Sequence, residues 1–234
     1  MAGFAYDASL LERFPAVHAG IAHVTNVVNG PSPQKLLDEY RAEQAATLRR
    51  LRGVSLSDLP SLAAWRRAFS AFGVKPTQYR SAAEALLRRL TKHGDIPSIS
   101  TLVDIGNLVS IRYALPVAFF DQAAVTGATT VRFAVGDESF TDLGSVTPVA
   151  PEPGEVVFVD DTGLVAARRW CWRQSAQSAT GPETTEVLVT VEGQHDTARQ
   201  DVAAALRDIV ELLRRYQPAS SIRSEHLSAA GPRF

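Results

Sequence analysis

The change from helical to strand-forming sequence falls within Ser100-Thr-Leu-Val-Asp-Ile-Gly-Asn-Leu-Val-Ser-Ile-Arg-Tyr-Ala-Leu-Pro-Val-Ala-Phe-Phe120. Its first half places Leu102, Ile105 and Val109 at helical spacing, and Ser100 precedes them as a typical helix cap. Pro116 ends that pattern and opens a run of strand-forming residues. We therefore expect mainly helices before this point and mainly strands after it, which predicts an α+β fold.

Upstream of this stretch, the sequence predicts short strands followed by three helices. β-branched residues between Phe14 and Val28 indicate one or two strands. Each of the three later segments has the periodicity and end signals of a helix. They are Gln34 to Leu51, with Ser32 as cap and Pro33 at the first position; Leu59 to Phe72; and Ala82 to Lys92, opened by the capping box Ser81 and Glu84.

Downstream, short β-rich runs alternate with glycine turns, and one long amphipathic segment follows them. The candidate strands are Val117–Phe120, Thr130–Val135, Val156–Val159, Leu164–Trp172 and Glu186–Val191, and the last helix spans about Thr197 to Tyr216. The tail after Pro218 is polar, and we expect it to be disordered. The sequence predicts one domain over residues 1–217: a mixed, mainly antiparallel sheet flanked by about five helices, with a tail at 218–234.

Composition and charge limit the classes of function. Apolar residues make up 45% of the chain and charged residues 21%, which is typical of a globular domain with a well-formed core. The net charge of −1 excludes the overall basic field that drives nonspecific nucleic-acid binding. Any RNA contact must therefore come from a local basic patch, and we expect no DNA partner.

Cysteine and histidine are too sparse for the usual metal and disulfide patterns. Cys171 is the single cysteine, which excludes an internal disulfide and a multi-cysteine zinc site. His18 and His23 form the one closely spaced histidine pair, and a pair alone specifies no metal. We expect no metal and no cofactor. The chain also shows no signal-peptide pattern and no apolar run near the roughly 20 residues that span a bilayer. We therefore expect a cytoplasmic protein with no membrane partner.

The most unusual segment is Arg168-Arg-Trp-Cys-Trp-Arg173, which holds three arginines, two of the three tryptophans and the cysteine. Two interpretations are open. The tryptophans pack in the core while the arginine stems reach water, or the segment forms a pocket for an anionic, nucleotide-bearing ligand. A regular strand would place Arg169 and Arg173 on one face and Trp170 and Trp172 on the other. Both pairs can line one pocket only if the strand is interrupted.

The order of several motifs resembles a known family. Leu102-Val-Asp-Ile-Gly-Asn107, which runs on to Ala114-Leu-Pro-Val-Ala-Phe-Phe-Asp121, resembles part of the tRNA-binding/editing domain of the phenylalanyl-tRNA synthetase β subunit. Val131-Arg-Phe-Ala134 and Gly136-Asp-Glu138 resemble a later block of that domain, and free-standing members of the family end this block with a strand similar to Arg168–Arg173. The resemblance covers roughly Trp65 to Glu192, about half of the chain.

The resemblance implies a pocket for the aminoacylated 3′ end of tRNA, where the synthetase hydrolyses tyrosine wrongly attached to phenylalanine tRNA. Asn107 matches the family's asparagine, whereas Gly106 replaces its threonine and Ala118 replaces its histidine. The Gly-Gly segment that carries the family's tyrosine-sensing glutamate has no counterpart here. Tyrosine specificity is therefore not transferred to this chain.

Seven residues are candidates for substrate binding. Asn107 and Ser110 would contact the aminoacyl group, Glu138 its free amino group, Arg169 and Arg173 the phosphates, and Trp170 or Trp172 the terminal adenine. Structural roles are the alternative. Asn107 and Ser110 would belong to a satisfied network at the N-terminus of their helix, Glu138 would be a solvated turn residue, and Cys171 would be a packing residue rather than a nucleophile.

Three functions are consistent with these sequence features. The first is a free-standing editing factor that hydrolyses misacylated aminoacyl-tRNA, since an aminoacyl ester needs only a positioned water and donors for the oxyanion. The second is a non-catalytic tRNA- or RNA-binding module that keeps the pocket fold. The third is a hydrolase of small molecules unrelated to tRNA.

Overall fold

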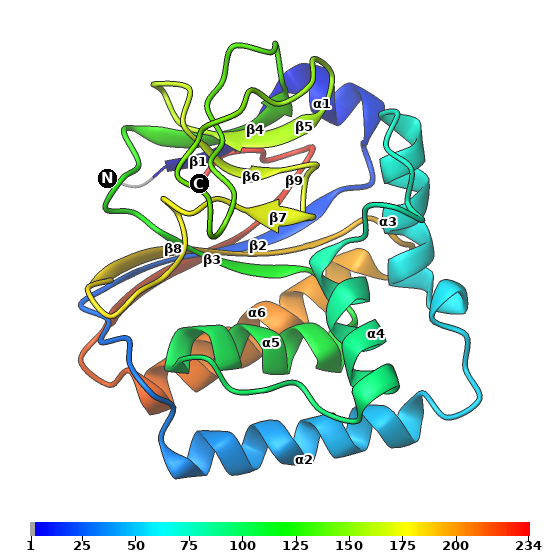
Figure 1. Ribbon diagram of the computed structural model, residues 1–234, viewed down its shortest axis with the longest axis vertical. Coiled ribbons are helices and arrows are strands. Elements are labelled where there is room, and N and C mark those ends of the chain that lie inside the picture. The colour runs from blue at the N-terminus through cyan, green and yellow to red at the C-terminus, as the bar shows by residue number, and fades with distance from the viewer. Residues whose placement is uncertain (1–2) are drawn as a thin grey trace.

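Two β-sheets lie one above the other in the computed structural model, which describes residues 3–234 (Figure 1). The five-stranded sheet has the order β1 (Gly3–Tyr6), β4 (Ala128–Phe133), β5 (Val156–Val159), β6 (Val165–Arg168) and β7 (Arg173–Gln174). The four-stranded sheet has the order β3 (Val117–Asp121), β8 (Glu186–Gly193), β2 (His18–Thr25) and β9 (Ser221–Ser228). β1 runs parallel to β4, and every other pair of these neighbours is antiparallel.

The helices cover one face and one side of this pair of sheets (Figure 1). They are α1 (Ala8–Arg13), α2 (Gln34–Arg50), α3 (Pro60–Ala71), α4 (Ala82–His93), α5 (Thr101–Tyr113) and α6 (Ala198–Tyr216), with a 3-10 turn at Leu56–Asp58. α5 and α6 pack on the outer face of the four-stranded sheet, and α2 packs against α5 as a further layer. α3 and α4 stand at one side of the stack.

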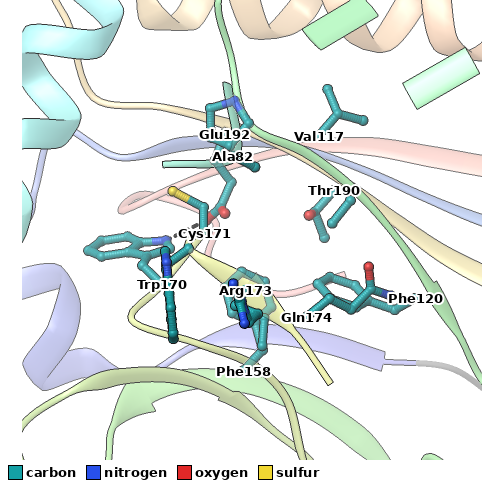
Figure 2. Close-up of a pocket in the computed structure, with 14 residues that line it drawn as sticks. Ala82, Val117, Phe120, Phe158, Trp170, Cys171, Arg173, Gln174, Thr190 and Glu192 are labelled. Carbon is teal, nitrogen blue, oxygen red and sulfur yellow. Dashed lines mark hydrogen bonds between the residues drawn. The ribbon is translucent and has the colours of Figure 1, made fainter. Parts of the chain in front are cut away.

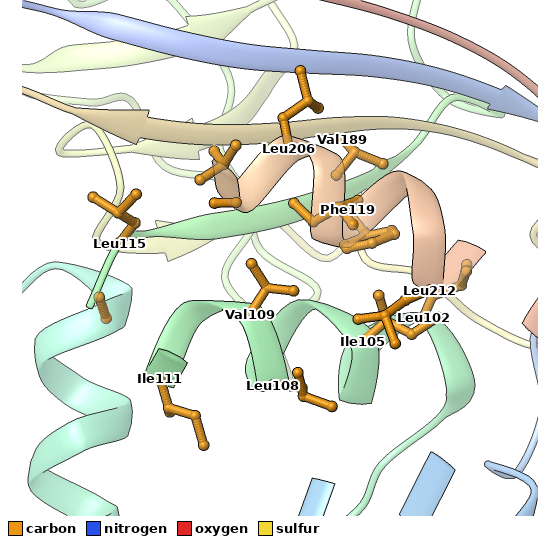
Figure 3. Packing of buried hydrophobic residues seen from close by; sticks show 14 of the residues in the cluster. Leu102, Ile105, Leu108, Val109, Ile111, Leu115, Phe119, Val189, Leu206 and Leu212 are labelled. Carbon is orange, nitrogen blue, oxygen red and sulfur yellow. The ribbon is translucent and has the colours of Figure 1, made fainter. Parts of the chain in front are cut away.

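One hydrophobic core lies between the four-stranded sheet and the helices (Figure 3). The α5 residues Leu102, Ile105 and Val109, whose spacing predicts a helix, are fully buried there. They pack with residues of the sheet such as Phe119 and Val189. Burying a side chain of this size contributes about 1.5–3 kcal/mol. This core therefore holds α5 firmly against β3.

A second core fills the space between the two sheets and is rich in aromatic rings. The alternation of β2 divides its residues between the two cores. Ile21 belongs to the core between the sheets, whereas Ala22 and Val24 belong to the core on the helix side. Trp65 of α3 and Trp170 meet edge to face in the second core, with ring centroids 5.1 Å apart.

The α+β class is confirmed, and most predicted elements are present within a few residues. The structure divides the strands between two sheets, and α1 is an additional short helix, capped by Asp7. The capping box at α4 forms, since Ser81 accepts a hydrogen bond from the Glu84 backbone. Ser32 does not cap α2. Its hydroxyl donates instead to the buried carboxylate of Asp104 at 2.6 Å.

Two predictions about the later part of the chain are wrong. The tail is not disordered throughout, because β9 pairs along its whole length with β2 and buries Leu227 between the sheets. The predicted strand Leu164–Trp172 is interrupted, because the chain leaves β6 after Arg168 and resumes as β7 at Arg173. None of the helices within residues 3–234 combines the length and hydropathy that a membrane-spanning helix needs.

Candidate functional site

A pocket opens where the two sheets and the start of α4 meet (Figure 2). One wall comes from the four-stranded sheet, with Val117, Ala118 and Phe120 of β3 and Thr190 and Glu192 of β8. Phe158 of β5, in the other sheet, lies beside the segment from Trp170 to Gln174, which completes the lining. The pocket is therefore mostly apolar with a few polar groups, as is common for small-molecule binding sites.

A tight turn shapes the wall that contains Cys171. Arg169 and Trp170 adopt left-handed backbone conformations, with φ values of 46° and 59°. Such conformations cost non-glycine residues about 1–3 kcal/mol each and persist only where the surroundings enforce them. Here the Trp170 backbone donates to Val156, and the Ala82 backbone donates to the Cys171 carbonyl at 2.8 Å. The turn thus sends the Trp170 side chain into the core and leaves Cys171 and the two residues after it along the pocket.

Glu192 is the most unusual group in the pocket. Its side chain is almost fully buried, and its Oε1 accepts hydrogen bonds from the Trp170 indole at 3.0 Å and from the Tyr6 hydroxyl. Within residues 3–234, Oε2 accepts no hydrogen bond. Burial raises the pKa of Glu192 to about 7, although both hydrogen bonds act to lower it. This carboxyl group can therefore gain or lose a proton near neutral pH.

Cys171 lies beside the Glu192 carboxylate (Figure 2). Burial, together with that neighbouring charge, raises the pKa of the Cys171 thiol well above its usual value. The thiol is therefore protonated at neutral pH and is a poor nucleophile. Within residues 3–234, no group of three or more His, Cys, Asp or Glu side chains is arranged to hold a metal ion.

Three of the seven predicted site residues line the pocket: Trp170, Trp172 and Arg173. Trp170 is fully buried, so its ring is not available for stacking on a base. Trp172 is partly buried and meets the Tyr79 ring edge to face, with centroids 5.0 Å apart. Arg173 is exposed and pairs with Asp142 at 2.8 Å. Because the turn interrupts the strand, tryptophan and arginine side chains do reach the same pocket.

Arg169 lies behind the pocket wall rather than in it. Its guanidinium pairs with Glu155 at 2.7 Å and lies over the rings of Tyr79 and Trp172, at 4.0 and 4.8 Å from their centroids. Arg168 forms two hydrogen bonds to the same Glu155 carboxylate. These two arginines hold the turn in place.

Asn107, Ser110 and Glu138 are not among the residues that line this pocket. Asn107 is partly buried on α5. Ser110 is buried and donates to the carbonyl of Leu115, just beyond the end of α5, at 2.7 Å. Glu138 is buried rather than solvated. It binds Arg132 and accepts hydrogen bonds from the Val135 and Gly136 backbones, so it organises its own loop.

Two of the three departures from the family motif, Gly106 and Ala118, have a physical counterpart. A Cβ atom on Gly106 would lie 3.1 Å from the Phe119 ring, so a threonine at this position would require that ring to shift. Ala118 lines the pocket, and its methyl group therefore keeps apolar a wall where the family has an imidazole. The chemistry of this pocket thus favours an apolar occupant.

Thr190 and Glu192 are pocket residues that no sequence motif singled out. Strand alternation contained a signal for them, because Leu188, Thr190 and Glu192 share one face of β8. Leu188 is buried between the sheets, so the carboxylate of Glu192, which lies on the same face of β8, must also point inward. An acidic residue at an inward position of a strand is a candidate functional group.

Comparison with known proteins identifies a family and shows similarity to chains from two organisms. The model of the B3/4 domain family matches residues 64–217. Over 94 residues the chain is 30% identical to the phenylalanine–tRNA ligase β subunit of Shewanella oneidensis, a match that covers 40% of this chain and 12% of the relative. An N-terminal fragment of the phenylalanyl-tRNA synthetase β subunit from Pyrococcus horikoshii aligns with 94% of this chain and 50% of the fragment, at 12% identity and a TM-score of 0.47. The matched regions thus span half or less of those two chains.

Proposed function

This chain belongs to the B3/4 domain family, and on that premise we propose that its pocket receives the 3′ end of an aminoacylated tRNA and hydrolyses the ester of a wrongly attached amino acid. One observation carries the proposal: a buried carboxylate, Glu192, faces a mostly apolar pocket with one of its two oxygens unpartnered within residues 3–234. The similarity to a subunit of phenylalanine–tRNA ligase supports the choice of tRNA as the substrate.

In the proposed reaction, Glu192 acts as the general base. Its carboxylate takes a proton from a water molecule, and the water oxygen attacks the ester carbonyl carbon. The bond from that carbon to the ribose oxygen breaks, and the proton passes to the ribose oxygen. The products are the free amino acid and the uncharged tRNA. A pKa of about 7 suits both halves of this proton transfer.

The remaining pocket residues have supporting roles. Thr190 lies two residues before Glu192 on the same face of β8, and its hydroxyl is the proposed donor to the developing oxyanion. The apolar wall at Val117 and Ala118 would hold an apolar amino-acid side chain. Trp172 and Arg173 would contact the terminal nucleotide, the first by stacking and the second through phosphate.

A non-catalytic tRNA-binding module is the second candidate. It is favoured by the positions of Asn107, Ser110 and Glu138, which do not line the pocket, and by Ala118 in place of the family's histidine. In this case the pocket would bind the 3′ end without turnover.

The decisive experiment measures hydrolysis of a panel of mischarged tRNAs. We expect the wild type to deacylate at least one of them, and Glu192→Gln to slow that reaction by about 100-fold, the low end of what general-base catalysis contributes. Glu183→Gln, on an exposed residue just before β8, is the matched control and should leave the rate unchanged. Tight tRNA binding with no turnover on any substrate would instead support the second candidate.

A further inference from the structure

Positive charge is concentrated in one segment of the chain. Residues 60–94 contain seven Lys and Arg residues and a single acidic residue, in a chain whose net charge is −1. This segment forms α3, α4 and their connection. The largest local excess of positive charge therefore lies on these two helices.

The single acidic residue, Glu84, organises the patch without neutralising it. Its side chain is buried and receives Arg66 at 3.0 Å and Arg88 at 2.8 Å. Arg80 lies 3.7 Å from the same carboxylate, and its Nε is buried without a hydrogen-bond partner in the described part of the chain. One negative charge thus positions three guanidinium groups, so the cluster keeps a net positive charge.

These side chains line a groove whose polar groups suit contact with phosphate. Arg66, Arg80, Arg88 and Lys92 line it together with the hydroxyls of Ser55, Ser57 and Thr91. Arg66 also lines an adjoining hollow with Arg67 and Ser70. Guanidinium, ammonium and hydroxyl groups are the usual protein contacts to phosphate oxygens. Within residues 3–234, no aromatic side chain lines either hollow, which favours contact with a nucleic-acid backbone over stacking on bases.

Residues of the groove and of the pocket are neighbours in the chain at the start of α4. Ala82 begins α4, lines the pocket and donates its backbone N–H to Cys171. Arg80 lies two residues earlier in the chain and lines the groove. A nucleic acid whose 3′ end entered the pocket would therefore carry its neighbouring phosphates past α4.

We propose that this groove, together with the adjoining hollow, binds the phosphodiester backbone of the acceptor stem of the tRNA whose 3′ end enters the pocket. The proposal rests on the proposed function for the identity of the RNA. The basic groups supply affinity and orientation without reading sequence.

The test uses uncharged tRNA, so that binding is measured apart from hydrolysis. Arg67 and Lys92 are exposed and make no ion pair with Glu84, so Arg67→Glu combined with Lys92→Glu should leave the fold intact. We expect this double variant to weaken tRNA binding at least about tenfold and to reduce the slope of log K against log salt by about 2. Arg214→Glu, on exposed α6 surface, is the control and should bind like the wild type.

A second substrate distinguishes a failure of binding in the groove from a failure of hydrolysis in the pocket. 3′-Aminoacyl-adenosine has no stem, so the double variant should hydrolyse it at the wild-type rate. Tight, salt-sensitive tRNA binding by a protein with no hydrolase activity would refute the catalytic function and support the groove. If the double variant binds tRNA with wild-type affinity and salt slope, or if the wild type does not bind tRNA, the groove proposal is wrong.

Discussion

Trp170 donates its indole N–H to Oε1 of Glu192 at 3.0 Å and thereby joins the two sheets. Trp170 lies two residues after the end of β6 in the five-stranded sheet, whereas Glu192 belongs to β8 in the four-stranded sheet. The Tyr6 hydroxyl, from β1, completes this buried polar cluster. The packing of the two sheets and the ionisation of the pocket carboxylate are therefore coupled.

The coupling predicts a pH-dependent stability. The pKa of Glu192 is raised from 4.5 to about 7 in the folded chain, so the folded state holds this proton more tightly than the unfolded state. The stabilisation of the folded state by protonated Glu192 is full below about pH 4.5 and is lost as the pH rises through about 7. The loss is on the order of 3 kcal/mol. Urea unfolding at pH 5 and pH 8 should show a larger decrease for the wild type than for Glu192→Gln, which cannot ionise. Equal decreases would contradict the prediction.

Removing a hydrogen-bond donor to Glu192 should raise the pKa of its carboxyl group further. Tyr6→Phe deletes a hydrogen bond that lowers the pKa of Glu192, so that pKa should rise further. The variant should also lose about 1–3 kcal/mol of stability, because a buried acceptor loses a partner. Infrared titration of the carboxyl band in Tyr6→Phe and wild type measures the shift. A pKa that falls or stays the same would show that the hydroxyl does not stabilise the carboxylate.

The two tryptophans of the turn should respond differently to truncation. Trp170 is fully buried and packs edge to face on Trp65 and on Phe14, so Trp170→Ala should cost about 3–5 kcal/mol. Trp172 is partly exposed in the pocket wall, so Trp172→Ala should cost much less stability and should mainly weaken tRNA binding. Thermal unfolding and tRNA titration of both variants check this contrast. Similar losses of stability in the two would count against it.

Gly106 should not tolerate the threonine of the family motif. A side chain there meets the Phe119 ring, so Gly106→Thr should destabilise the fold by about 1–3 kcal/mol, although glycine is a poor helix former. Gly30→Ala is a matched control, because a Cβ on Gly30 meets nothing within 4 Å. Chemical denaturation of the two variants gives the comparison. A Gly106→Thr variant as stable as the control would mean that Phe119 moves aside at little cost.

Regular elements were predictable from the sequence because their signals are local. The spacing of Leu102, Ile105 and Val109 located α5, and the Ser81 capping box located the start of α4. α1 has six residues, too few to show a helical period. Leu227 is the one buried residue of β9, so the sequence of this strand resembles that of a polar tail.

The candidate site was harder to predict than the fold. The turn depends on left-handed conformations at Arg169 and Trp170, and these residue types give no sequence signal for them. Tertiary contacts from Val156 and Ala82 enforce the turn instead. Glu192 owes its unusual pKa to burial between two sheets, which no local pattern describes.

The hydrogen bond from Ala82 to Cys171 has a thermodynamic consequence. It connects the first turn of α4 to the wall of the pocket, so any shift of this helix would act directly on that wall. If filling the groove changes the affinity of the pocket for its ligand, filling the pocket must change the affinity of the groove by the same factor. A long anionic ligand and a small ligand would then help or hinder each other reciprocally, with a single backbone contact as the link.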